Sequence, residues 1–150
     1  MSITIRKMKR GDIEAVYNIE RKCFPYPFSE SLIMALFFAS PDLCFVIEED
    51  AKIFGFLLGG RTEEEKELHI LSISVLEDYR GKRYGRMLME YFIVEAKRLE
   101  FEVIMLEVRT DNSSAILLYE KLGFQFVRTL RRYYEDNCDG KLYRLNLIEN

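Results

Sequence analysis

The sequence predicts an α/β protein in which one mixed sheet carries helices on both faces. Short apolar stretches typical of strands recur along the chain, amphipathic helical patterns separate them, and a strand–helix–strand unit lies near the middle. The expected order is β-α-α-β-β-β-α-β-α-β-β. At 150 residues, the length favours a single domain over residues 1–150.

The first half of the chain is expected to hold two helices and four strands. Residues 2–7 alternate as a strand, and a helix follows from residue 11 to about residue 24. Pro25 and Pro27 force an extended loop, because each proline disfavours helical backbone in the residue before it. Ser29 is expected to cap a second helix that carries Leu32, Ile33, Leu36 and Phe37. Strands are then expected over residues 43–48, 52–58 and 68–75, with turns at 49–51 and at Gly59–Gly60 followed by the charged run 61–67.

The second half begins with the clearest helix, over residues 84–99. Its apolar stripe consists of Tyr84, Met87, Leu88, Tyr91, Phe92 and Ala96. A strand over 103–109 precedes a helix over 112–122, with Asn112 at its N-cap and Gly123 after its end. Two last strands, 124–134 and 142–148, flank a turn signal at Asp139–Gly140.

Composition excludes several classes of protein. Hydrophobic residues make up 49% and charged residues 31%, which is ordinary for a globular domain. The net charge of −3 argues against a protein that coats nucleic acid. Three cysteines without metal-ligand spacing predict neither a disulfide framework nor a zinc site, and they favour a reducing compartment. No apolar run approaches the ~18 residues of a membrane span, and we expect a cytoplasmic location.

The most informative segment is the basic turn, residues 80–86, which joins a strand to the long helix. It holds two glycines, Gly81 and Gly85, and four cations: Arg80, Lys82, Arg83 and Arg86. A helix N-terminus attracts anions, and glycine lets the backbone approach a phosphate, so the segment predicts a diphosphate site. Two alternatives remain open. One is a basic helix start without a ligand, and the other is a nucleotide-binding fold, although its G-x-G-x-x-G or G-x-x-x-x-G-K-[ST] pattern is absent.

Two stretches resemble a known family. Residues 80–85, Arg-Gly-Lys-Arg-Tyr-Gly, resemble the R/Q-x-x-G-x-G/A signature with which the GNAT superfamily of N-acetyltransferases cradles the pyrophosphate of coenzyme A. Arg83 stands where that signature has its first glycine. Residues 106–124 resemble the L-E-V-R-x-x-N-x-x-A-I-x-L-Y-E-x-L-G-F stretch of amino-terminal protein acetyltransferases, both the RimI-type ribosomal-protein alanine enzymes and the archaeal ones. The resemblance follows the order of elements from residue 2 to about 148. It implies a GNAT fold with a mostly antiparallel sheet, and direct acetyl transfer within a ternary complex from acetyl-coenzyme A to free protein or peptide N-termini.

The resemblance also implies roles for individual residues. Asn112 is implied to contact the pantetheine arm, Tyr119 to lie near the thioester sulfur, and Glu107 to activate the attacking amine through water. The backbone of Ile73, Ser74 and Val75 is implied to pair with the pantetheine arm and to donate to the acetyl carbonyl. The other implied binding residues are Arg80, Gly81, Lys82, Arg83, Tyr84, Gly85 and Arg86 for the coenzyme, and Phe24, Pro25, Tyr26, Tyr133 and Tyr134 for the substrate N-terminus.

His69 is the only histidine and lies on the strand over 68–75. If that strand neighbours the one over 103–109, His69 can approach Glu107. The resemblance to archaeal enzymes implies that it shares base duty, while a structural role stays open. A His–Glu pair alone makes a poor metal site, and none is predicted. Structural roles also stay open for Glu107 in the sheet, Tyr119 in the core, and Tyr133 and Tyr134 as strand aromatics.

Three functions remain in competition. The first is protein amino-terminal acetylation, the second is acetylation of small-molecule amines on the same scaffold, and the third is an inactive coenzyme-A-binding partner subunit. The run 106–124 favours the first, and the joint presence of Glu107, Tyr119 and Asn112 argues against the third. Expected partners are protein or peptide N-termini, with ribosomal proteins and nascent chains as candidates. We expect acetyl-coenzyme A as cosubstrate, no metal, no direct contact with nucleic acid, and no membrane. The sequence does not indicate whether an auxiliary subunit exists.

Overall fold

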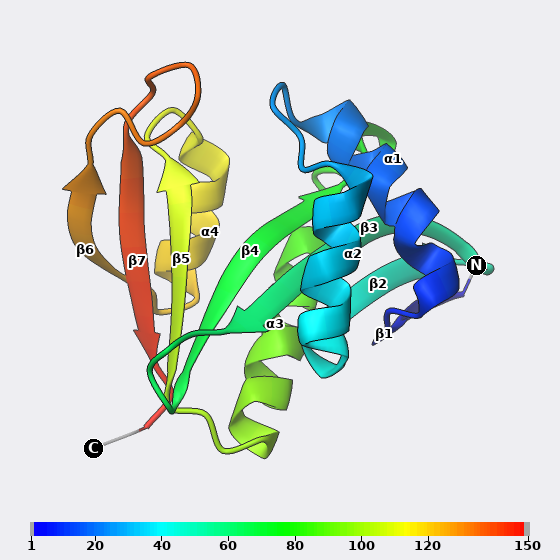
Figure 1. Cartoon of the computed structure of the whole chain (residues 1–150), viewed down its shortest axis with the longest axis horizontal. Coiled ribbons are helices and arrows are strands. Elements are labelled where there is room, and N and C mark those ends of the chain that lie inside the picture. The colour runs from blue at the N-terminus through cyan, green and yellow to red at the C-terminus, as the bar shows by residue number, and fades with distance from the viewer. Residues whose placement is uncertain (1, 149–150) are drawn as a thin grey trace. The chain divides into compact units, whose positions relative to one another are not determined.

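The computed structural model describes residues 2–148 (Figure 1). The strands form one sheet in the order β1-β2-β3-β4-β5-β7-β6, in which β4 and β5 run parallel while β1–β2, β2–β3, β5–β7 and β6–β7 are antiparallel. The strands are β1 Ile3–Lys7, β2 Cys44–Glu49, β3 Lys52–Arg61, β4 Glu67–Val75, β5 Val103–Arg109, β6 Gln125–Leu130 and β7 Gly140–Asn146. The helices are α1 Ile13–Cys23, α2 Glu30–Ala39, α3 Tyr84–Arg98 and α4 Ser113–Lys121. The predicted class and order of helices and strands are confirmed.

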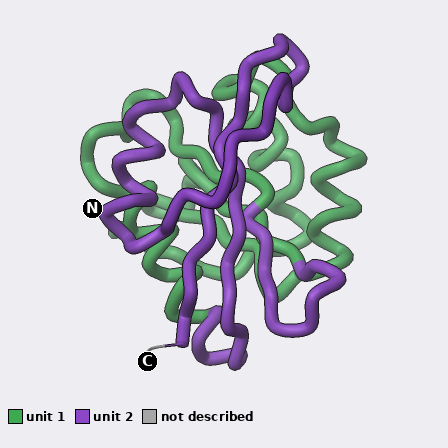
Figure 2. The backbone as a smooth tube through the Cα atoms, turned by 90° about the vertical axis from the view of Figure 1, so that its left-hand side faces the viewer, with its two compact units in different colours: residues 1–60, 71–95 green, residues 61–70, 96–150 purple. Residues whose placement is uncertain are grey.

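The chain divides into two compact units (Figure 2). The first unit comprises residues 1–60 and 71–95, and the second comprises residues 61–70 and 96–150. The boundary falls within β4, whose first residues, 67–70, belong to the second unit and whose last, 71–75, belong to the first. In the part of the chain that the structure describes, no helix is long and apolar enough to cross a bilayer.

In the first unit, helices cover both faces of β2 and β3, as predicted. Figure 1 shows α1 and α2 in front of these strands and α3 behind them. Alternate strand residues explain this arrangement, because successive side chains of a strand point to opposite faces. Val46 shares a buried core with α1 and α2, while the ring of its neighbour Phe45 packs edge-on against Tyr91 and Phe92 of α3.

The buried stripe of α3 differs from the prediction by one position. Met87 is exposed, whereas Met89 is fully buried together with Leu88 and Phe92. Successive helix residues are about 100° apart, so the face centred on Leu88 and Phe92 includes Met89 and leaves Met87 at its edge.

The turn predicted at Gly59–Gly60 is wrong, because β3 continues through both glycines to Arg61. A Cβ atom on Gly59 would lie 2.5 Å from the Phe92 ring and 2.8 Å from the Leu43 carbonyl oxygen. Glycine is therefore needed here for the close approach of α3 and not for a change of chain direction.

In the second unit, α4 packs beside β7. The buried Tyr143 of β7 donates a hydrogen bond from its hydroxyl to Glu120 of α4, at 2.9 Å. The side chain of Asn112 caps α4 by accepting a hydrogen bond from the backbone N–H of Ala115, and Gly123 follows the helix with a φ of +99°. Both predicted signals for the ends of this helix are confirmed, as is the N-cap of α2 at Ser29.

The strand predicted over 124–134 is wrong beyond Leu130. β6 ends there, and residues 131–139 form a loop that leads to β7. Arg132 and Asn137 adopt left-handed φ angles of +51° and +67°, which a strand does not allow. The Asp139 carboxylate accepts a hydrogen bond from the Arg132 N–H at 2.8 Å and so fixes the loop. The tyrosine pair, Tyr133 and Tyr134, lies on this loop and not on a strand. The loop also takes the place of the tight turn expected at 139–140.

Candidate active site

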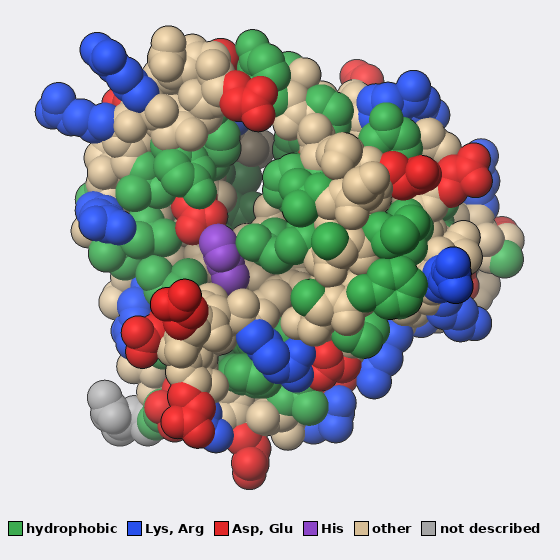
Figure 3. Space-filling view, in the orientation of Figure 1, with side chains coloured by type: hydrophobic (Ala, Val, Ile, Leu, Met, Phe, Trp, Pro, Cys, Tyr) green, Lys and Arg blue, Asp and Glu red, His purple; other side chains and the backbone are tan. Residues whose placement is uncertain are grey.

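Strands β4 and β5 place a histidine and a glutamate side by side in the second unit. Their parallel register pairs His69 with Met105, two residues before Glu107. His69 Nε2 lies 2.7 Å from Glu107 Oε1, and the two side chains are 27% and 18% exposed. Figure 3 shows the single histidine at the surface with an acidic side chain beside it. The predicted approach of His69 to Glu107 is confirmed, and the pair is open to solvent.

Two tyrosines, Tyr133 and Tyr134, lie close enough to Glu107 for its charge to affect them. Burial and then the Glu107 carboxylate raise the pKa of Tyr133, and burial, Tyr133 and Glu107 raise the pKa of Tyr134. The two rings meet edge to face at 5.0 Å. Tyr119 is buried, and burial raises the pKa of its phenol to about 12. A phenol in such surroundings keeps its proton at neutral pH.

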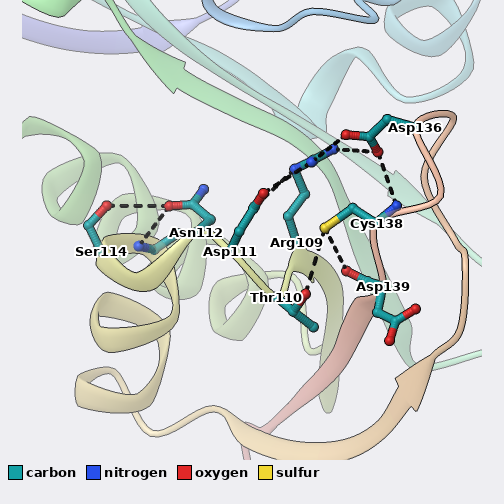
Figure 4. A network of polar contacts seen from close by, with 9 residues as sticks. Arg109, Thr110, Asp111, Asn112, Ser114, Asp136, Cys138 and Asp139 are labelled. Atoms are coloured by element: carbon teal, nitrogen blue, oxygen red, sulfur yellow. Dashed lines mark hydrogen bonds and ion pairs between the residues drawn. The ribbon is translucent and has the colours of Figure 1, made fainter.

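Arg109, at the end of β5, ties that strand to the loop of the tyrosine pair (Figure 4). Its guanidinium is hydrogen-bonded to both carboxylate oxygens of Asp111, at 3.0 and 3.2 Å, and to both of Asp136, at 3.1 and 2.7 Å. These hydrogen bonds lower the pKa of both carboxyl groups. The guanidinium carbon also lies 5.3 Å from the centre of the Tyr134 ring. Arg109 was not identified from the sequence as a site residue. The feature that could have indicated it is its position at the end of the strand of Glu107, two residues before Asp111.

Asn112 is placed by the start of α4 (Figure 4). Its side-chain oxygen accepts hydrogen bonds from the Ala115 N–H and the Ser114 hydroxyl, both at 3.3 Å. The amide NH₂ points away from the cap in Figure 4 and is directed to donate elsewhere. Asn112 therefore combines a helix cap with a hydrogen-bond donor suited to a polar ligand.

The basic turn lies in the first unit and has the backbone of an anion-binding loop. Gly81 and Arg83 have φ angles of +78° and +67°. A Cβ atom on Gly81 or Gly85 would meet nothing within 4 Å, so the space beside both glycines is open. The exposed side chains of Lys82 and Arg83 flank the first turn of α3, whose N–H groups have no partner within the helix. These features fit a diphosphate such as that of coenzyme A.

The remaining residues of this segment are engaged within the first unit. Arg80 Nε donates to the Val75 carbonyl oxygen at 3.0 Å and ties the turn to the end of β4. Arg86 faces Glu90 at 3.6 Å, one helical turn further on. The Tyr84 ring packs edge-on against Phe54.

At the end of β4, Ile73 and Ser74 are partly exposed, whereas Val75 is buried.

The loop between α1 and α2 carries Phe24, Pro25 and Tyr26. Tyr26 is half exposed, while Phe28 packs against the core of α1 and α2. The loop is held by Glu20 of α1, a residue that sequence reasoning missed. Its signal is a charged residue next to Ile19, on the apolar side of the helix.

Among residues 2–148, no group of three or more His, Cys, Asp or Glu side chains is arranged to hold a metal ion. His69 and Glu107 form a pair, not a group of three or more possible metal ligands. The His69–Glu107 pair, in the second unit, offers groups that can transfer a proton.

Residues 13–124 match the acetyltransferase (GNAT) family, and the chain belongs to this family of acyltransferases. It is 34% identical over 142 residues to the [ribosomal protein bS18]-alanine N-acetyltransferase of Escherichia coli (strain K12), a match that covers 92% of this chain and 90% of that protein. It is 32% identical over 149 residues to an N-alpha-acetyltransferase of Sulfurisphaera tokodaii, covering 92% and 89%. The crystal structure of Ard1 from Thermoplasma volcanium superposes with a TM-score of 0.94 at 30% identity, over 99% of this chain and all of that one. The resemblance found in the sequence is confirmed.

Proposed function

We propose that the protein is an N-terminal acetyltransferase, which transfers the acetyl group of acetyl-coenzyme A to the free α-amino group of a protein or peptide. The observation that carries this proposal is the 2.7 Å contact between His69 and Glu107, on a face that the tyrosine pair also borders. The relatives named as N-alpha-acetyltransferase and as ribosomal-protein alanine N-acetyltransferase support the same substrate class.

Glu107 is assigned the role of general base. An α-amino group has a pKa of about 7.7–8.0 and is mostly protonated at pH 7, so it must lose a proton before it can attack. The Glu107 carboxylate accepts that proton directly or through a water molecule. His69 holds the carboxylate in position by its hydrogen bond and shares the proton.

Tyr119 is assigned the role of general acid. Acetyl-coenzyme A, when bound, supplies an activated acyl group with a thiolate as leaving group. The buried phenol of Tyr119 is protonated at neutral pH, and we assign it to donate this proton to the thiolate as that group leaves. Backbone N–H groups of Ile73 to Val75 are assigned to the acetyl carbonyl oxygen, because fixed donors stabilise the negative charge that develops there.

The binding roles follow from the shape and charge of each segment. The basic turn, residues 80–86, is assigned to the coenzyme's pyrophosphate, and the NH₂ group of Asn112 to its pantetheine arm. Phe24, Pro25 and Tyr26 on one loop, and Tyr133 and Tyr134 on another, are assigned to the substrate's N-terminus.

We further infer that the chain acts as one catalytic domain in the cytoplasm. The match to the family extends over residues 13–124, which include segments of both compact units. Candidate substrates are ribosomal proteins and nascent chains, since both present free N-termini in that compartment.

Free α-amines should be preferred to lysine side chains. A lysine ε-amine has a pKa of about 10.4, roughly 2.5 units above that of an α-amine, and each unit corresponds to about 1.36 kcal/mol. Deprotonating the lysine therefore costs several kcal/mol more before any contact with the enzyme is made.

The test uses one peptide in two forms, with a free and with a blocked N-terminus, each carrying the same internal lysine. Mass spectrometry after incubation with acetyl-coenzyme A should show acetylation of the first form only, at its α-amine. Comparable acetylation of both forms would refute the preference for N-termini. Acetylation of polyamines or aminoglycosides but of neither peptide would identify a small-molecule acetyltransferase instead.

A further inference from the structure

Glu20, near the end of α1, is a carboxylate that is only 2% exposed. Its Oε1 accepts a hydrogen bond from the Ser72 hydroxyl of β4 at 2.7 Å, and its Oε2 accepts one from the Phe28 N–H at 2.9 Å. Both donors are neutral, and burial raises the pKa of the carboxyl group. A buried carboxylate without a cationic partner lowers the stability of a fold. The two groups that Glu20 binds therefore indicate what its role is.

Glu20 holds both ends of the loop between α1 and α2. Its backbone carbonyl accepts a hydrogen bond from the Phe24 N–H at 3.1 Å, and its side chain accepts the one from Phe28. Two prolines, Pro25 and Pro27, lie between these ends; they have no N–H and restrict their own φ angles. Fixing the two ends therefore determines much of the conformation of residues 24–28.

The same carboxylate joins this loop to β4 through Ser72. The next residues of the strand, from Ile73 on, are those to which we assign contact with the acetyl carbonyl. Glu20 thus links the loop assigned to the substrate's N-terminus with the strand assigned to the transferred group, entirely within the first unit.

We propose that Glu20 is a positioning residue, which fixes the loop over residues 24–28 on β4 in the conformation that binds the substrate's N-terminus. The proposal rests on the proposed function for the role of this loop. Without the carboxylate, the Phe28 N–H loses its acceptor and the loop samples more conformations. The peptide must then order the loop as it binds, which weakens its binding. Binding of acetyl-coenzyme A depends on the basic turn and should not change.

The kinetic test compares three variants. Glu20→Ala should raise the KM for a peptide about tenfold or more while the KM for acetyl-coenzyme A stays within about twofold. Glu20→Gln should restore most of the peptide affinity, because its amide oxygen can accept from Phe28 while its NH₂ donates to Ser72. Glu14→Ala, on an exposed position of the same helix, should behave as the wild type.

Hydrogen exchange measured by NMR tests the loop without using activity. The Phe28 amide should exchange about tenfold faster or more in Glu20→Ala than in the wild type, and near the wild-type rate in Glu20→Gln. The Leu32 amide, which is bonded to the Ser29 hydroxyl oxygen, should stay protected and so report that α2 is folded.

Unchanged exchange of the Phe28 amide in Glu20→Ala would overturn the proposal. Faster exchange with an unchanged peptide KM would also overturn it, because the loop would then be fixed by Glu20 without binding the substrate. A wild-type enzyme that acetylates amines but no peptide would refute the proposed function, and the exchange rates would still decide whether Glu20 holds the loop. An equal rise of both KM values would reduce Glu20 to a general structural role.

Discussion

The 2.7 Å separation of His69 Nε2 and Glu107 Oε1 is that of a hydrogen bond. In the function proposed above, this contact holds the Glu107 carboxylate toward the amine that it deprotonates. Arg109 follows Glu107 by two residues on the same strand, but its guanidinium forms ion pairs with Asp111 and Asp136. Glu107, which we propose as the base, is therefore contacted by His69 and not by the guanidinium of Arg109.

Replacing Glu107 by glutamine should lower kcat by about 10²-fold or more, because general base catalysis contributes about 10²–10⁴-fold. The KM for acetyl-coenzyme A should change little. The loss should be greatest near pH 7 and shrink above pH ~8, where the α-amine is neutral without help. Steady-state kinetics over this pH range measure the effect.

Glu135→Gln is the matched control, since it removes the same charge from an exposed position on the tyrosine loop. Unaltered turnover in Glu107→Gln, or an equal loss in both variants, would move base duty to His69 or to bulk water.

Arg83 shows how a side chain can occupy a position that usually needs glycine. Its φ of +67° costs a residue with a Cβ atom about 1–2 kcal/mol. Arg83→Gly should consequently be more stable than Arg83→Ala by about 1 kcal/mol in urea unfolding. At Lys82, whose φ is not positive, the order should reverse, because glycine lowers stability there through its unfolded-state entropy. The same order at both positions would contradict the assignment of strain to Arg83.

Among the elements, β3 and α3 are coupled through Gly59. Gly59→Ala should lower the free energy of unfolding by about 1–3 kcal/mol, since the added methyl group would overlap the Phe92 ring and the Leu43 carbonyl oxygen. Gly11→Ala is the control, because a Cβ atom there meets nothing within 4 Å. Urea unfolding of both variants measures the difference, and equal stability would show that the helix can shift at no cost.

Local signals in the sequence predicted most of the elements. The caps at Ser29 and Asn112 and the stop at Gly123 depend on hydrogen bonds and φ angles within a few residues, and all three are confirmed. The two errors in the strands have different origins. Gly59 is a strand residue because of Phe92, which is distant in sequence. Residues 131–139 form a loop because of a contact within the loop, from the Arg132 N–H to the Asp139 carboxylate, which a strand pattern does not indicate.

The candidate site divides in the same way. Strand alternation and the expected neighbourhood of two strands were enough to predict the meeting of His69 with Glu107. Arg109 and Glu20 were missed because their importance lies in their partners. Arg109 is bonded to Asp136, 27 residues away, and Glu20 to Ser72, 52 residues away. No spacing rule along the chain indicates either pair.

At the scale of the whole molecule, acetyl-coenzyme A should stabilise the folded chain. A ligand that binds only the folded state contributes about 2.7 kcal/mol at 100 times its Kd. For a chain of this length that corresponds to a rise in Tm of roughly 5–10 °C. Differential scanning fluorimetry with acetyl-coenzyme A, ATP and NAD, each at the same concentration, measures it.

Added salt should reduce the shift with acetyl-coenzyme A, since Arg80, Lys82 and Arg83 of the basic turn are exposed in a chain whose net charge is −3. A shift with ATP and none with acetyl-coenzyme A would contradict the assignment of the turn.

Arg83 also bears on how such enzymes are recognised and how they diverge. If this position requires a positive φ angle, glycine adopts it most easily, but a residue with a side chain can adopt it too. A pattern written in letters rejects this chain at that position, whereas a pattern written in backbone conformations accepts it. A protein can then carry a cation instead of a glycine in such a turn, which adds positive charge to the turn for a modest loss of stability.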